Sequence, residues 1–150
     1  MKSFITSQFG YCPLIWMFHS RTLNNKINAI HERALRITFK DSTSNFEELL
    51  SKDNSVSIHH RNLQVLAIEI FKIKNKMAPE FLNEIFQEKT ASYNLRRNSN
   101  FFIRKVHSVY HGTESLSFLG PKIWELVPEG LKQSESLEIF KDKIKKWVPN

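Results

Sequence analysis

The chain has 150 residues, of which 41% are apolar and 12% aromatic, with a single cysteine and a formal net charge of +7. A chain of this length and composition can bury a core as one domain, which excludes a largely disordered protein. One cysteine excludes an internal disulfide, and no apolar stretch approaches the roughly 20 residues of a transmembrane helix. The positive charge favours a polyanionic partner such as nucleic acid, but charge alone leaves binding and non-binding equally open.

The chain opens on an apolar and aromatic stretch, FGYCPLIWMFHS, over residues 9–20. Polar residues interrupt the apolar run before it and no small-residue cleavage site follows, so a signal peptide is not expected. We expect an intracellular protein, cytoplasmic or nuclear and not secreted. Trp16 is expected to turn inward onto Leu23, Ile27 and the central helix predicted further along the chain.

Apolar spacing predicts a first long helix over about 21–39. Its expected buried stripe consists of Leu23, Ile27, Ile30, Ala34 and Ile37. A basic stripe of Lys26, Arg33 and Lys40 lies about a quarter of a turn away. The basic stripe is either a shoulder that contacts phosphates or a solvated flank whose stems cover the core edge.

Three further helices are predicted along the chain. Ser44 and Glu47 have capping-box spacing, which predicts a short helix after them. A wide apolar face predicts a central buried helix over about 57–77, after which Pro79 ends the helix or starts another. A last helix is expected over about 135–148, with Ser134 as a plausible N-cap.

Residues 93–113 contain Arg96, Arg97, Arg104 and Lys105 and no acid. Their aromatic and β-branched residues, the break at 111–112 and the alternating Leu116 and Phe118 predict a β-hairpin over 93–120. After Gly120-Pro121, a short turn is expected to carry Trp124. The expected fold is mainly α, a small helical bundle with a short β-hairpin in its second half.

No motif in the sequence predicts catalysis, a metal or a cofactor. His107 and His111 are four residues apart but flank an expected turn rather than share a helix, and the other histidines lack the i, i+4 or paired-cysteine spacing of a zinc site. Nothing near Cys12 would activate its thiol, and no nucleophile elbow, phosphate-binding loop or dinucleotide-binding motif is present. We expect no catalytic residue, no metal and no cofactor.

Six blocks, in order, carry a family resemblance: SQFGYCPLIWMFHSR, LNNKINAIHERALRITF, SNFEELL, IHHRNLQVLAIEIFK, SLSFLGPKIWELVP and FKDKIKKW. They resemble the region downstream of the polymerase palm in non-LTR (LINE-type, jockey-like) retrotransposon reverse transcriptases, over essentially all 150 residues. The most diagnostic parts are Tyr11-Cys12 with Trp16, IHERALRI at 30–37 and FLGPKIW at 118–124.

The resemblance implies a thumb-like helical domain over residues 1–150, with residues 1–20 as a palm-to-thumb junction. The family's catalytic aspartates lie upstream in a Tyr-x-Asp-Asp motif, which this chain lacks. The chain would then be a catalytically incomplete fragment whose partners are the missing palm domain and a template–primer duplex. Relatives continue into a Cys-rich tail, which this sequence does not include.

The leading hypothesis is therefore contact with RNA or DNA backbone without sequence specificity. The candidate nucleic-acid-binding residues are Lys26, Arg33, Arg36, Lys40, Arg96, Arg97, Arg104 and Lys105. The alternative is a protein-interaction module with no nucleic-acid role, whose apolar N-terminus docks on a partner. An independent enzyme ranks third, no membrane role is expected, and the oligomeric state stays open.

Overall fold

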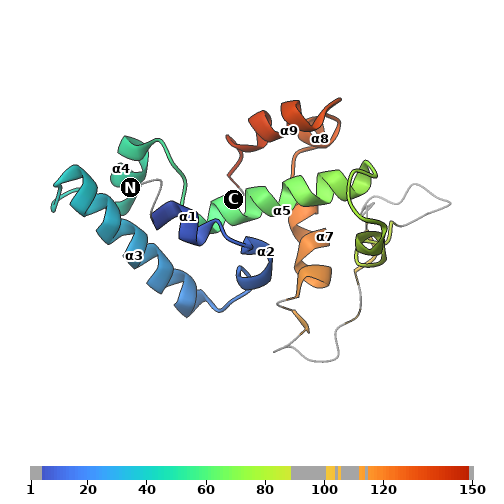
Figure 1. Cartoon of the computed structure of the whole chain (residues 1–150), viewed down its shortest axis with the longest axis horizontal. Helices are drawn as coiled ribbons and strands as arrows, with labels where there is room; N and C mark the ends of the chain where they lie inside the picture. The colour runs from blue at the N-terminus through green and yellow to red at the C-terminus, as the bar shows by residue number, and fades with distance from the viewer. Residues whose placement is uncertain (1–4, 89–100, 104, 106–111, 114, 149–150) are drawn as a thin grey trace. The chain divides into compact units, whose positions relative to one another are not determined.

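The computed structural model describes residues 5–88, 101–103, 105, 112–113 and 115–148 (Figure 1). This part of the chain is mainly α-helical, as predicted. In it, every helix is too short or too polar to span a lipid bilayer. The chain divides into two compact units, Met1–Asn62 and Leu63–Asn150. The single domain over 1–150 and the junction over 1–20 stay predictions.

The first unit contains four helices among its described residues: α1 (Ile5–Phe9), α2 (Pro13–Trp16), α3 (Arg21–Phe39) and α4 (Phe46–Asp53). The predicted helix over 21–39 is confirmed by α3, and the predicted short helix by α4. These two helices lie in contact with each other. Because α3 is by far the longest of them, its orientation about its own axis decides which side chains this unit buries.

The predicted buried stripe of α3 is wrong for three of its five members. Leu23, Ile30 and Ile37 are exposed, Ile27 is half-buried and only Ala34 is buried. The helix instead buries a neighbouring face that consists of His31, Ala34 and Leu35. The reason is the contact with α4, where the His31 ring meets the Phe46 ring edge-on at 5.6 Å between centroids. A buried histidine next to an aromatic ring thus replaces an aliphatic residue in the core.

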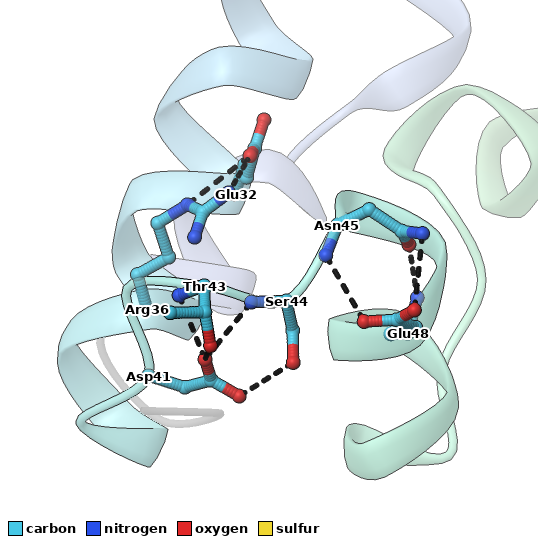
Figure 2. A network of polar contacts seen from close by, with 7 residues as sticks. All are labelled: Glu32, Arg36, Asp41, Thr43, Ser44, Asn45 and Glu48. Atoms are coloured by element: carbon cyan, nitrogen blue, oxygen red, sulfur yellow. Dashed lines mark hydrogen bonds and ion pairs between the residues drawn. The ribbon is translucent and has the colours of Figure 1, made fainter.

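The connection from α3 to α4 is built from side chains that bond to nearby backbone (Figure 2). The capping box is present, but it pairs Asn45 with Glu48 rather than Ser44 with Glu47. The Glu48 N–H donates to Asn45 Oδ1 at 2.8 Å, and the Asn45 N–H donates to Glu48 Oε2 at 3.1 Å. Ser44 does not cap the helix, because its hydroxyl donates to Asp41 at 2.7 Å.

The N-terminal segment keeps much of its apolar surface in solvent. Tyr11 is 77% exposed and Ile15 is 81% exposed, whereas Met17 is buried. The Trp16 indole N–H donates to the Tyr11 carbonyl at 2.8 Å, and its ring stacks on His19 at 6.0 Å. These contacts hold the segment in a local turn.

The second long helix, α5 (Ile58–Lys74), begins in the first unit and continues into the second, as the prediction over 57–77 anticipates. The second unit adds the 3₁₀ helix η1 (Glu80–Glu84), α7 (Leu116–Leu126), α8 (Glu129–Lys132) and α9 (Leu137–Ile144). Helix α5 ends at Lys74, five residues before Pro79, and Pro79 stands as N-cap of η1, so of the two alternatives it starts a helix. The last predicted helix is confirmed by α9, although its N-cap is Ser136 rather than Ser134.

A chain of five aromatic rings forms the core of the second unit. Phe71 of α5 stacks on Phe140 of α9 with 4.3 Å between ring centroids, and Phe140 lies 6.1 Å from Trp124 of α7. Trp124 then meets Phe101 at 6.4 Å, and Phe101 meets Phe86 at 5.7 Å. All five rings are buried. These contacts bring together three helices and the segment that carries Phe101.

The polar contact that joins α9 to α5 is made by the buried Gln64. Its side-chain amide donates to the carbonyls of Lys145 and Trp147, at 3.2 and 2.9 Å. These carbonyls follow the end of α9, where backbone acceptors have no partner within the helix. One buried amide therefore satisfies the carbonyl of the C-cap Lys145 and a second carbonyl just after the helix.

The predicted β-hairpin is wrong where the described residues test it. Leu116 and Phe118 lie in α7, not in a strand, and Phe101 forms an isolated antiparallel bridge with Glu88. The rest of residues 93–120 lies largely outside the described residues. The alternation of two apolar residues was misleading, because the apolar spacing continues helically to the buried Ile123 and Trp124.

The short turn predicted after Gly120-Pro121 is also wrong, since Trp124 and both of these residues lie inside α7 and are buried. A proline in a helix cannot donate to the carbonyl four residues earlier, so this turn of α7 forms at a cost. Packing explains why a glycine occupies position 120. A Cβ atom built on Gly120 would lie 2.5 Å from Cε1 of Phe86. The glycine thus lets the backbone of α7 approach the aromatic core.

We expect Gly120→Ala to destabilise the chain by roughly 1–3 kcal/mol, because the added methyl group forces the buried Phe86 ring to move. Urea unfolding followed by circular dichroism measures this loss. Gly130→Ala is the matched control, since nothing lies within 4 Å of its Cβ position. The control should be neutral or stabilising by up to about 1 kcal/mol. Equal effects of the two substitutions would contradict the packing argument.

Stability should fall as the pH drops below about 6.5, because burial lowers the pKa of His31 from its ordinary 6.5, an effect that Asp53 opposes and Arg61 reinforces. The unfolded chain takes up a proton at this histidine near pH 6.5, whereas the folded chain does so only at lower pH. Urea unfolding at pH 7.5 and 5.5 measures the loss. His31→Gln should reduce this pH dependence; a dependence unchanged by the substitution would contradict the assignment.

Candidate nucleic-acid interface

The candidate site is the solvent-facing side of α3. The helix buries His31, Ala34 and Leu35, and this rotation turns Lys26 and Arg33 into solvent. These two residues, the cation row, are seven residues apart and therefore lie above one another on the helix. Neither makes an ion pair with any residue that the structure describes. Their charges are available to an external anion.

Lys40 does not continue the cation row. It is the C-cap of α3 with φ 51° and ψ 39°, in the left-handed region. Its backbone N–H donates to the Arg36 carbonyl, which closes the helix. Because the helical geometry ends here, the seven-residue spacing no longer sets the direction of the Lys40 side chain. Lys40 is exposed and belongs to the same end of α3, but not to its helical face.

Arg36 is the predicted site residue that the structure makes least available. Its Nε and Nη2 atoms donate to Glu32 Oε1 at 3.1 and 2.7 Å (Figure 2). The two side chains are about equally half-buried, at 31% and 32% exposure. The pair is one turn apart along the helix, so it neutralises the guanidinium locally. A phosphate at this position would have to compete with Glu32.

The acid closest to Lys40 in sequence is itself fully engaged. Asp41 accepts hydrogen bonds from the Thr43 and Ser44 backbone and hydroxyl groups, and forms an ion pair with Lys52 (Figure 2 shows the first two partners). The hydrogen bond from Lys52 is the main reason why the pKa of Asp41 lies far below its usual range. The hydrogen bonds from Ser44 are the next largest cause. This carboxylate stays charged and fixes the turn after α3.

The remaining predicted cations belong to the second unit. Arg96, Arg97 and Arg104 lie outside the described residues, and Lys105 is exposed. The structure therefore brings together Lys26 and Arg33 on one face, with Lys40 at the end of the same helix.

The histidines and Cys12 offer no alternative centre within the described residues. There, no group of three His, Cys, Asp or Glu side chains could hold a metal ion. His59 and His60 lie 6.0 Å apart between ring centroids, and burial is the main cause that lowers the pKa of His59. Cys12 is exposed, with φ 43°.

Two features of this surface were missed from the sequence. Arg21 and Arg61 are exposed cations of the first unit that were not named as site residues. More importantly, Leu23, Ile30 and Ile37 lie beside the cation row in solvent rather than in the core. The signal that could have found this is the competing stripe of His31, Ala34 and Leu35, which has the same helical spacing.

No protein-family model, curated protein or solved structure matches this chain. The resemblance to non-LTR retrotransposon reverse transcriptases therefore stays a prediction from the sequence.

Glu32→Gln should strengthen binding to polyanions, because it removes the carboxylate that neutralises Arg36. The expected result is elution from a heparin column at a higher salt concentration than the parent chain. Glu47→Gln is the matched control, since it makes the same charge change at an exposed position of α4. If both variants elute together, net charge rather than the release of Arg36 explains the shift.

Proposed function

We propose that this chain binds the phosphate backbone of RNA or DNA through α3, without reading the base sequence. The observation that carries the proposal is the cation row, two exposed and unpaired cations on one helix face within the described residues. The resemblance to the thumb region of reverse transcriptases supports the same role. The proposal assigns no catalytic step to this chain.

The geometry of the row suits a nucleic-acid strand. Seven residues of α-helix advance about 10 Å, which corresponds to about three phosphates at 3.4 Å of axial rise per strand. Flexible side chains such as Lys26 and Arg33 reach phosphates as charged donors without a fixed register on the bases. Backbone contact of this kind gives affinity that depends on salt and discriminates little between sequences.

The charge of α3 supports the same proposal. The helix carries Arg21, Lys26, Arg33 and Arg36 against the single acid Glu32, which leaves an excess of three positive charges (four minus one). Its first turn contains no acid. The helix therefore presents one sign of charge over most of its length, which attracts a polyanion at a distance.

A protein-interaction module is the second candidate function. The observation that favours it is the exposure of Tyr11 and Ile15 in the N-terminal segment, at 77% and 81%. Apolar side chains that lie in solvent are common at surfaces that bind other proteins. A defined complex in light scattering without any shift of nucleic acid in a gel would favour this candidate.

The nucleic-acid proposal is tested with the double variant Lys26→Glu, Arg33→Glu. Binding of a labelled 20-base-pair duplex is measured by fluorescence anisotropy at several salt concentrations. Each phosphate contact contributes about 0.9 to the slope of log affinity against log salt, so the loss of two contacts should lower that slope by about 2. Affinity at low salt should fall at least tenfold.

The matched control is Lys143→Glu, Lys146→Glu, which makes the same charge change at two exposed positions of the second unit. The proposal requires the salt slope of the control to stay close to that of the parent chain. Equal loss in both double variants, or no binding by the parent chain at low salt, would overturn it.

A further inference from the structure

Three apolar side chains of α3 form a row in solvent that no described part of the chain covers. Leu23 is 48% exposed, Ile30 is 56% exposed and Ile37 is 71% exposed. They lie along one side of α3, which has 19 residues and is the longest helix of the first unit (Figure 1). We call these three residues the apolar row.

The spacing of the apolar row is that of a helix–helix contact. Its members are seven residues apart, so they drift only about 20° per step and form a nearly straight line. The row extends over 14 residues, about 21 Å of helix. A narrow line of this kind fits one partner helix, as at the contact line of a coiled coil.

The cation row runs parallel to the middle part of the apolar row. Lys26 and Arg33 each follow a member of the apolar row by three residues, which places the two rows about 60° apart. Glu32, the only acid of α3, follows Ile30 by two residues and lies about 160° away on the helix, where Arg36 engages it. The apolar row is therefore flanked by positive charge and by no acid of its own helix.

This combination selects among possible occupants. In a second copy of this chain, the same cations would flank the same contact line and repel each other. A membrane surface favours a helix with a broad apolar face, whereas the other side of α3 is already buried in its own unit. A nucleic-acid backbone would satisfy the cations but leave the aliphatic side chains in water.

We propose that the apolar row binds a single amphipathic helix of another protein, one whose apolar residues recur every seven positions and are flanked by Asp or Glu. The partner's apolar side chains would cover Leu23, Ile30 and Ile37, and its acids would pair with Lys26 and Arg33. This inference does not depend on the proposed function. If both hold, the partner helix and nucleic acid compete, because both use the cation row.

The test uses two synthetic peptides of three heptads, each with leucines at the contact positions. One peptide has Glu at the flanking positions and the other has Lys. Fluorescence anisotropy with the full chain should give at least tenfold tighter binding of the Glu peptide. The double variant Ile30→Gln, Ile37→Gln should weaken binding of the Glu peptide at least tenfold.

Ala29→Gln is the matched control, since Ala29 is exposed on α3 about 100° away from Ile30. It should leave peptide binding unchanged. Both row residues are exposed, so the double variant should keep the circular-dichroism spectrum of the parent chain. Ile37→Gln alone, at the most exposed of the three positions, gives a second variant if the double variant unfolds.

Four results would overturn the inference. They are equal binding of the Glu and Lys peptides, no binding of either, self-association in light scattering that the double variant abolishes, and binding to phosphatidylserine vesicles that depends on Ile30 and Ile37. The apolar-row variant should leave duplex binding within twofold of the parent chain, whereas the cation-row variant should lower it. The two proposals can therefore fail separately.

Discussion

The contact between α3 and α4 is the constraint on which the surface of the first unit depends. His31, Ala34 and Leu35 are buried, with the His31 ring against Phe46, and this fixes the rotation of α3 about its axis. A helix that packs through one face leaves the rest of its surface, here its outer face, open to solvent. The aliphatic residues and cations of that outer face are in solvent because a histidine, rather than an isoleucine, was drawn into the core. The turn held by Asp41 then fixes where α3 ends.

The second unit depends on aromatic packing in place of an aliphatic core. A ring of α9 contacts one ring of α5 and one ring of α7, and Gln64 donates to two carbonyls after the end of α9. Aromatic side chains bury large areas and prefer stacked or edge-to-face geometry, so they fix the positions of short helices that could not be stable alone. This explains how α9, with eight residues, has a defined place in the unit.

The outer face of α3 combines two kinds of surface that favour different partners. Exposed cations favour phosphates, and an aliphatic line of seven-residue spacing favours a helix. The pairing of Arg36 with Glu32 concentrates the available charge on Lys26 and Arg33, next to that line. If both proposals hold, this one short surface binds a nucleic acid or an acidic helix, but not both at once. Which partner binds then depends on whether apolar burial or charge neutralisation contributes more to the free energy of binding.

Local patterns in the sequence determined the helical class, the extent of α3 and α5, and the restart of the helix at Pro79, because these depend on interactions between near neighbours. Tertiary structure decided the rest. Two stripes of α3 have the same period, and only the contact with α4 selects the one that contains His31. In the sequence, Gly120-Pro121 indicates that a turn follows. In the structure, the close approach of Phe86 and the burial of Trp124 favour a continuous helix. Whether a side chain is buried depends on which other element packs against it, and that element can lie far away in the sequence.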